Sequence, residues 1–227
     1  GTIVSAQIAS NGRQRRLMAE MTIEQVMGLA PVIPVLTIER VEDAVPLAQA
    51  LVRGGLPALE ITLRSAAALA AIEAIAGAVP DAVPGVGTVT SPDDLARARG
   101  AGARFAVSPG FAPDLVAAAA GLSKMAFLPG IATASEAMAA QRAGLTCLKF
   151  FPAEAMGGPA TLQALAGPFA SLVFCPTGGI GRHNAGDYLS LGNVRCVGGS
   201  WIAPREAVAE KQWQVIANLA AEAAAMK

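Results

Sequence analysis

Residues 146–158 read TCLKFFPAEAMGG, an apolar run that leads through a short turn to a glycine pair. The segment 146–151 predicts a buried β-strand, and the segment from about 159 to 165 predicts the helix that follows it. Lys149 interrupts the apolar run. A bare ammonium is costly to bury unless it is paired, and the usual escape is loss of the proton. The neutral amine is then a nucleophile suited to Schiff-base formation with a ketone or an aldehyde.

The same alternation of an apolar run with an Ala-rich stretch recurs along the chain and gives eight β/α units in 227 residues. Nearly continuous apolar strands are expected when both faces of a parallel sheet are covered. We therefore expect a (β/α)8 TIM barrel in a single domain, residues 21–227, with a doubly wound open sheet as the alternative. The expected strands are 32–36, 58–63, 82–89, 105–108, 125–128, 146–151, 172–176 and 194–197.

Helices are expected after each strand, and one short helix precedes the first strand. Thr22 and Gln25 have the spacing of a capping box, which predicts that the short first helix begins there. Residues 1–20 look like a loosely held N-terminal extension. The expected helices of the barrel include 41–53, 66–78, 113–120, 135–143, 159–165, 184–191 and 211–225.

The composition excludes several classes of function. Lys plus Arg and Asp plus Glu number 17 each, so no basic surplus suggests a nucleic-acid partner. No apolar stretch reaches the about 18 residues of a membrane span. The basic residues near the start follow the first apolar residues instead of preceding them, which argues against a signal peptide. We expect a cytoplasmic protein whose partner is a small molecule.

The cysteines and the histidine give no sign of a metal centre. Cys147, Cys175 and Cys196 are isolated in β-like runs and form no CxxC pair, so we expect reduced core thiols. His183 is the only histidine, which excludes a multi-histidine metal site and a histidine-based triad. We therefore expect no metal and no cofactor.

Polar side chains late in the strands are the candidates for chemistry, because barrels of this kind place their sites at the C-terminal strand ends. Glu60 lies two residues before Thr62 and four before Arg64, so these three share one face of a strand. The apolar residues between them face the covering helices, which turns the polar set toward the barrel axis. Lys149 and Phe151 share a face in the same way.

Each of these signals also fits a structural role. Glu60 and Lys149 together are compatible with a static ion pair inside the barrel. Arg64 is compatible with a surface residue at a strand end. Thr88 and Thr177 end the third and seventh strands, where they also fit residues that begin a turn.

Two glycine-rich turns follow the seventh and eighth strands, at 177–180 (TGGI) and 198–201 (GGSW). Loops in these positions often hold a phosphate group in barrels. Glycine lets backbone amides approach an anion closely, and a short following helix adds its positive end. Plain tight turns are the alternative interpretation.

The motifs ALEITLR, GVGT, SPG, LPG, LKFFPAEAMGG, FCPTGGI and GGSW occur in this order between Val32 and Trp201. In order and spacing they resemble the bacterial 2-keto-3-deoxy-6-phosphogluconate (KDPG) / 4-hydroxy-2-oxoglutarate (KHG) aldolases, which are class I aldolases of the Entner–Doudoroff pathway. The resemblance implies a homotrimeric (β/α)8 barrel without a metal. It also implies cleavage of KDPG to pyruvate and glyceraldehyde 3-phosphate.

The resemblance further implies a role for each matching residue. It places the Schiff base on Lys149 and the acid/base role on Glu60. The pyruvyl carboxylate is held at Arg64 and Thr88, Phe151 lies beside the imine, and Thr177 is linked to stereochemical control. The phosphate end matches Gly178, Gly179, Gly199 and Ser200.

The sequence departs from the family pattern in three places and leaves other functions open. Val86 stands where alanine is common, Met156 where asparagine is common, and Gly181 where a small hydroxyl residue often follows. The last departure leaves a preference for KHG, or for the galactonate epimer of KDPG, as an alternative. A non-catalytic phosphate- or sugar-binding barrel is the remaining alternative.

Overall fold

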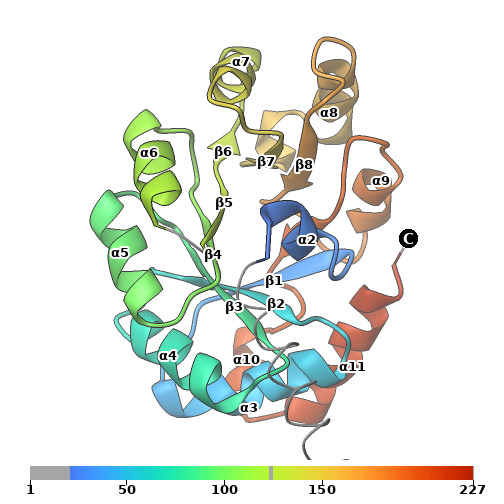
Figure 1. Cartoon of the computed structure of the whole chain (residues 1–227). Helices are drawn as coiled ribbons and strands as arrows, with labels where there is room; N and C mark the ends of the chain where they lie inside the picture. The colour runs from blue at the N-terminus through green and yellow to red at the C-terminus, as the bar shows by residue number, and fades with distance from the viewer. Residues whose placement is uncertain (1–20, 123–124, 227) are drawn as a thin grey trace, which may run out of the picture.

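The structure is a computed structural model that describes residues 21–122 and 125–226. Parallel strands alternate with helices along this part of the chain, and the helices surround the strands (Figure 1). The N-terminal extension expected at residues 1–20 lies outside the described residues. No helix in the described part is long and apolar enough to cross a membrane.

The strands and helices alternate in chain order. The strands are β1 (Val32–Leu36), β2 (Ala58–Thr62), β3 (Val83–Gly87), β4 (Phe105–Val107), β5 (Ala126–Leu128), β6 (Gly130–Ile131), β7 (Cys147–Phe150), β8 (Val173–Pro176) and β9 (Val197–Gly199). The helices are α2 (Ile23–Met27), α3 (Val41–Arg53), α4 (Ala68–Ala78), α5 (Pro92–Gly100), α6 (Pro113–Gly121), α7 (Ala134–Arg142), the 3₁₀-helix η1 (Glu154–Met156), α8 (Gly158–Ala166), α9 (Ala185–Leu189), α10 (Arg205–Ala209) and α11 (Trp213–Ala224).

The strands form a curled, wholly parallel arrangement in two pieces. One piece has six strands in the order β5-β4-β3-β2-β1-β9, and the other has three in the order β6-β7-β8. Two isolated parallel bridges connect these pieces: Phe174 of β8 pairs with Val194, just before β9, and Thr177, just after β8, pairs with Gly198 of β9. The expected α/β class with a parallel sheet is confirmed. The structure divides the strands into two sheets where one closed eight-stranded barrel was expected.

Local signals in the sequence explain where several helices begin. Ser91 and Thr133 each form a capping box, in which the side chain accepts a hydrogen bond from the backbone amide three residues later. Pro92 occupies the first position of α5, where a missing N–H is harmless. The capping box expected at Thr22 and Gln25 is present and begins α2.

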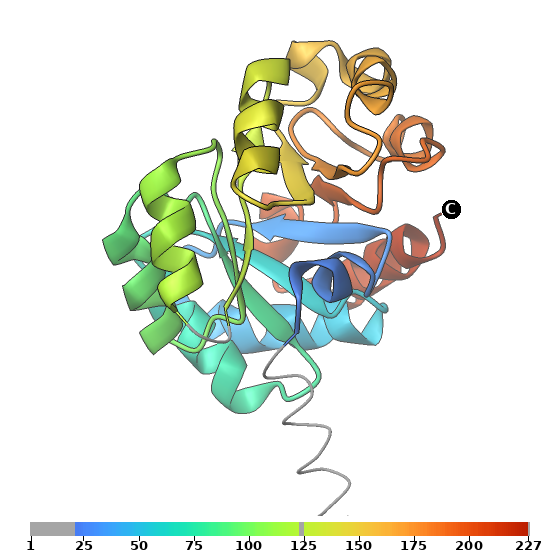
Figure 2. The same cartoon turned by 45° about the horizontal axis from the view of Figure 1, so that its top comes forward.

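The core has an inner layer that lies at the N-terminal ends of the strands. Ile33, Val83 and Phe105 point into this layer, and Val26 and Met27 of α2 are buried against it. The short helix therefore covers the end of the sheet opposite the strand ends where a site was expected (Figure 2).

The inner layer also contains the three free cysteines, Cys147, Cys175 and Cys196, all buried. Burial, together with the nearby charge of Glu24, raises the pKa of the Cys147 thiol to about 11. A hydrogen bond with Cys175, with burial, raises the pKa of Cys196 well above its usual value. Thiols of this kind are protonated at neutral pH, as expected for core cysteines.

Several expected boundaries differ from the structure by one to three residues, and three of these differences have a cause in the backbone. The last strand was expected at 194–197 but lies at Val197–Gly199, because the chain before it makes only an isolated bridge to β8. The last helix begins at Trp213 instead of residue 211, where Lys211 has a φ of 55° and interrupts the chain after α10. The third strand ends at Gly87, because Thr88 takes a φ of 62°.

Candidate active site

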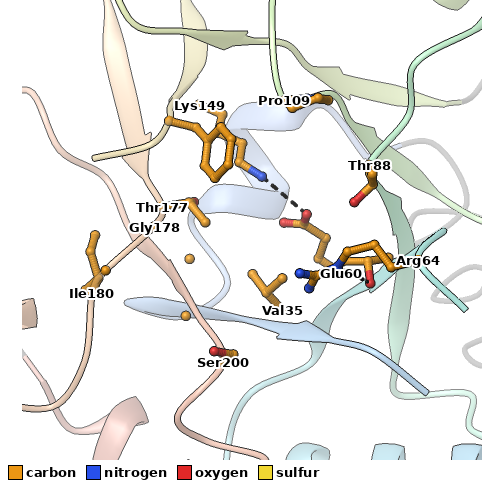
Figure 3. Close-up of a pocket in the computed structure, with 15 residues that line it drawn as sticks. Val35, Glu60, Arg64, Thr88, Pro109, Lys149, Thr177, Gly178, Ile180 and Ser200 are labelled. Carbon is orange, nitrogen blue, oxygen red and sulfur yellow. Dashed lines mark hydrogen bonds and ion pairs between the residues drawn. The ribbon is translucent and has the colours of Figure 1, made fainter. Parts of the chain in front are cut away.

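A cavity of about 280 Å³ opens at the C-terminal ends of the strands (Figure 3). It is lined by every residue that the sequence proposed for a site: Glu60, Arg64, Thr88, Lys149, Phe151, Thr177, Gly178, Gly179, Gly199 and Ser200. Residues from distant parts of the chain meet there because successive parallel strands end at the same edge. The structure therefore brings the whole predicted set together, although geometry alone assigns no role.

Lys149 and Glu60 meet across this cavity. The lysine Nζ lies 3.4 Å from Oε1 of the glutamate, as the dashed line in Figure 3 marks. Both side chains are buried, with residue exposures of 6% and 4%. The amine also lies 5.1 Å from the ring centroid of Phe151. The amine is thus held between a carboxylate and an aromatic face, where little water can reach it.

Room for the carboxylate comes from a glycine on the adjacent strand. A Cβ added at Gly87 would approach Cγ of Glu60 to 2.7 Å and would overlap the carboxylate oxygen. Real Cβ atoms do not tolerate such contacts, so Glu60 can keep this position only if residue 87 has no side chain. The pair β2–β3 therefore makes the space in which Glu60 turns toward Lys149.

Arg64 and Thr88 occupy the opposite wall of the cavity, just beyond the ends of β2 and β3. The guanidinium of Arg64 points back into the cavity, beside Val35 and Glu60 (Figure 3). The hydroxyl of Thr88 also points inward. Thr88 has a φ of 62°, a left-handed conformation that is rare for a β-branched residue and is typically held in place at functional sites.

The two glycine turns form the remaining wall. Gly178 and Gly179 have φ values of 105° and 74°, which residues with side chains rarely adopt. The first turn is tied to the segment after β7, because Ala153 N donates to Thr177 O at 2.8 Å and Glu154 N donates to Gly178 O at 3.1 Å. The turn is thereby fixed with its backbone facing the cavity.

The second turn depends on Gly198 and Gly199. A Cβ at Gly198 would lie 3.0 Å from Cγ2 of Thr177 and would overlap its hydroxyl. A Cβ at Gly199 would overlap the indole ring of Trp201. Close approach of neighbouring groups is therefore a second reason, besides backbone conformation, for glycines in this wall.

Sequence reasoning did not propose five lining residues: Val35, Thr62, Pro109, Ile180 and Gly198. Thr62 had a detectable signal, since it shares the inward face with Glu60. Pro109 and Gly198 belong to motifs that were recognised. Ile180 ends the recognised TGGI turn, whereas Val35 carries no signal, because a lone apolar residue in a strand is most often part of the core.

The three departures from the family pattern do not belong to the cavity wall. Among the described residues, Val86, Met156 and Gly181 are absent from its lining. Val86 is buried on the other face of β3. In the described ranges, no three His, Cys, Asp or Glu side chains gather as metal ligands would.

Comparison with known proteins identifies the family. Residues 23–219 match the family model of KDPG and KHG aldolases. The chain is 50% identical to the 2-dehydro-3-deoxy-phosphogluconate aldolase of Pseudoalteromonas atlantica over 91% of its length and 95% of that protein. It is 48% identical to the KHG/KDPG aldolase of Escherichia coli over 88% of its length and 93% of that protein.

Two solved structures are similar in fold as well as in sequence. The KDPG aldolase of Legionella pneumophila, with pyruvate captured as a covalent carbinolamine, has a TM-score of 0.88 and 43% identity over 90% of this chain and 99% of its own. The Zymomonas mobilis enzyme with 3-phosphoglycerate has a TM-score of 0.85 and 47% identity over 92% and 98%. The chain therefore belongs to the KDPG and KHG aldolase family.

Proposed function

We propose that the cavity around Lys149 is the active site of a class I aldolase that cleaves KDPG to pyruvate and glyceraldehyde 3-phosphate. The observation that carries this proposal is the buried contact of 3.4 Å between Lys149 Nζ and Glu60 Oε1 at the floor of the cavity. Membership of a family of aldolases, which are lyases, supports the reaction class. The reaction forms part of the Entner–Doudoroff pathway.

In the proposed first step, the amine of Lys149 attacks the keto carbon of the substrate. Loss of water gives a protonated imine, whose cationic nitrogen accepts the electrons of a breaking carbon–carbon bond far better than a ketone does. Glu60 lies beside the amine and is placed to take up its proton. The covalent pyruvate adduct of the Legionella pneumophila relative supports chemistry of this kind.

In the proposed second step, Glu60 removes the proton of the hydroxyl on carbon 4, directly or through water. The bond between carbons 3 and 4 then breaks, and glyceraldehyde 3-phosphate leaves. The bond electrons form an enamine of pyruvate on Lys149. Glu60 returns a proton to carbon 3, and hydrolysis of the resulting imine frees pyruvate and the amine. One carboxyl group serves both proton transfers because they are sequential.

The other lining residues divide between the two ends of the substrate. Arg64 can bind the pyruvyl carboxylate through parallel hydrogen bonds, with Thr88 beside it, which fixes the reacting carbon near Lys149. Phe151 lies against the imine and Thr177 beside the reacting carbons. The turns with Gly178, Gly179, Gly199 and Ser200 bind the phosphate. The 3-phosphoglycerate held by the Zymomonas mobilis relative is consistent with an anion site in this fold.

KHG is the second candidate substrate, because the Escherichia coli relative is named for both KHG and KDPG. The glycine wall, built for close approach of an anion, favours the phosphorylated substrate. The galactonate epimer of KDPG differs only in configuration at the cleaved bond, and Thr177 is the residue expected to discriminate it. Relative kcat/KM values on the three compounds rank them, and we expect the highest value on KDPG.

Borohydride trapping tests the proposed function. Reduction in the presence of pyruvate is expected to add the mass of the reduced adduct to the peptide that contains Lys149. The Lys149→Ala variant is expected to show neither the added mass nor pyruvate release from KDPG. A wild-type protein that stays unlabelled while it releases pyruvate would exclude the imine mechanism. A labelled protein that does not release pyruvate from any of the three compounds would exclude the aldolase.

We further propose that the strands close into one eight-stranded ring in a single domain. Pro129 alone separates β5 from β6, so the two are best described as one interrupted strand. The bridges from Phe174 to Val194 and from Thr177 to Gly198 support pairing across the other gap. Assembly as a homotrimer is carried over from the family resemblance, and a cytoplasmic location from the three free cysteines, which suit a reducing compartment. Light scattering on chains of 22.9 kDa tests the trimer.

A further inference from the structure

The hydroxyl of Thr62 is the centre of a small hydrogen-bond network inside the cavity. Thr62 is the last residue of β2, lines the cavity and is 2% exposed. Its Oγ1 lies 3.2 Å from Nε of Arg64, 3.1 Å from the carbonyl oxygen of Leu36 and 3.1 Å from Oγ1 of Thr37. One hydrogen bond is enough to satisfy a buried hydroxyl, so the three partners of Thr62 call for an explanation.

The number of available protons fixes the direction of each bond. A hydroxyl has one proton to donate and can accept two. The carbonyl of Leu36 can only accept, so Thr62 donates to it. The Nε–H of Arg64 can only donate, so Thr62 accepts from it. The hydroxyl of Thr37 therefore donates to Thr62. The capacity of the Thr62 hydroxyl is filled, and the network has one arrangement of hydrogens.

This arrangement determines which edge of the arginine is free. The guanidinium has five N–H donors in a fixed planar fork, and the Nε–H is engaged by Thr62. In the part of the chain that the structure describes, Arg64 has no carboxylate within ion-pair distance. The two terminal nitrogens are thus left for a ligand, and they point into the cavity (Figure 3).

We propose that Thr62 is a positioning residue, which holds the guanidinium of Arg64 with its terminal nitrogens toward the carboxylate of the keto acid. This role rests on the proposed function of the cavity and adds a residue to it. Arg64 lies beyond the end of β2, where no ladder of backbone hydrogen bonds fixes it. A displacement of about 1 Å in a substrate-binding group can cost about 10²-fold in rate. A side-chain anchor at the strand end prevents such a displacement.

A purely structural role for the hydroxyl is the competing explanation. Thr62 and Leu36 lie on neighbouring strands, so their bond also ties β2 to β1. In that case removal of the hydroxyl would lower stability but leave recognition of the carboxylate unchanged. The two explanations differ in what they predict for substrates with and without a carboxylate.

The test compares Thr62→Val with Thr62→Ser. Valine keeps the shape of threonine but loses the hydroxyl, whereas serine keeps the hydroxyl. We expect Thr62→Val to lower kcat/KM on KDPG about 10- to 100-fold. We expect Thr62→Ser to stay within about threefold of the wild type, since it restores the acceptor for Arg64. Thr62→Ala removes the same hydroxyl with less steric demand and replaces Thr62→Val if that variant does not fold.

Borohydride trapping with two ketones identifies the group through which Thr62 acts. Pyruvate has a carboxylate, and hydroxyacetone is a neutral ketone that can form the same kind of imine on Lys149. We expect the valine variant to need a higher pyruvate concentration for half-maximal labelling, with labelling by hydroxyacetone unchanged. An equal loss with both ketones, or no loss with either, would overturn the proposal.

Two further variants control the interpretation. Thr37→Val removes a hydroxyl from the same network but leaves the Thr62–Arg64 bond, so its pyruvate labelling should match the wild type. The double variant Thr62→Val/Arg64→Ala should be no worse than Arg64→Ala alone, because Thr62 acts through the arginine. Additive losses would contradict the proposal. Wild-type protein that pyruvate does not label at Lys149 would instead refute the proposed function itself.

Discussion

Glu60 reaches Lys149 because the neighbouring strand presents no side chain at Gly87. The carboxylate occupies the space of the missing Cβ, and its Cγ would lie 2.7 Å from that atom. Gly198 makes room for Thr177 in the same manner on the other side of the cavity. At the residue scale, the shape of the site therefore depends on the glycines at 87 and 198 as much as on the side chains of Glu60 and Thr177.

Gly87→Ala tests this view of the Glu60 position. The new methyl group meets the flexible end of Glu60, so we expect the side chain to swing away while the backbone stays in place. General acid–base groups contribute about 10²–10⁴-fold to a rate, so displacement should lower kcat by about tenfold or more. Steady-state kinetics with KDPG and a thermal melt measure the two effects separately.

The double variant Gly87→Ala/Glu60→Gln provides the control. If alanine acts only by displacing the glutamate, the double variant should be no slower than Glu60→Gln alone. A Gly87→Ala variant with wild-type kcat would show that the carboxylate does not need this space.

Much of the site was predictable at this scale, and the reason is periodicity. Side chains two apart in a strand share a face, so Glu60 and Lys149 could be placed inward from spacing alone. The hydrogen-bonding role of Thr62 could not be predicted, because spacing gives the face of a side chain but not its rotamer or its partners. The requirement for glycine at position 87 depends on a neighbour that is distant in sequence.

At the scale of helices and strands, α2 shows most clearly what the sequence could and could not predict. It contains only five residues, yet Met27 is fully buried and Val26 nearly so in the inner layer. Its first turn is tied to the residue just before β7, since Oγ1 of Thr146 donates to Oε1 of Glu24 at 3.1 Å. The capping box was visible in the sequence, but its attachment to the bottom of the strands was not, because the helix is too short to show an apolar face.

Glu24 makes the attachment of α2 dependent on pH. A backbone hydrogen bond is the main cause that lowers the pKa of Glu24 below its ordinary value of 4.5, and hydrogen bonds from Thr22 and Thr146 also contribute. The carboxylate therefore stabilises the fold above pH 4.5, and this contribution is lost as the pH falls through the lowered folded-state pKa. Glu24→Gln should thus lose less stability than the wild type on acidification from pH 7 to about pH 3.

Denaturant unfolding at the two pH values measures this difference. Thr22→Ala is the matched variant, since it removes the N-cap of the same helix without removing a charge. It should lower the free energy of unfolding by about 1 kcal/mol at pH 7 and by less at pH 3, because the hydrogen bond from Thr22 to Glu24 is lost once the carboxylate is protonated. Identical acid sensitivity of Glu24→Gln and the wild type would show that the carboxylate does not anchor the helix.

At the scale of the whole molecule, the last helix packs beside the first helix of the ring. α11 and α3 lie side by side in Figure 1 and form an extensive contact. The alternation of strands and helices predicted this order, because consecutive β/α units wind in one direction. The break at Pro129, the extra helix α10 and the shifted β9 were not predicted, since each depends on how the strands meet when the sheet curls.

α11 packs closely against the end of α3 at Gly54. A Cβ at this glycine would lie 2.6 Å from the backbone oxygen of Ala217 and would overlap the methyl group of Ala220. These atoms belong to a helix that is already packed, so they can yield only if α11 shifts as a body. Gly54→Ala should therefore lower the free energy of unfolding by about 1–3 kcal/mol, as overpacking does.

Gly77→Ala provides the matched control, because it adds the same methyl group where nothing lies within 4 Å. Gly77 lies within α4, where alanine should raise the stability by about 0.4–1 kcal/mol. Both variants should keep the wild-type kcat at temperatures where they are folded, since neither glycine lines the cavity. If Gly54→Ala and Gly77→Ala were equally stable, the packing of α11 against α3 would not depend on the missing side chain at Gly54. A fall in kcat for Gly54→Ala alone would instead show that a shift of α11 displaces the residues at the C-terminal ends of the strands.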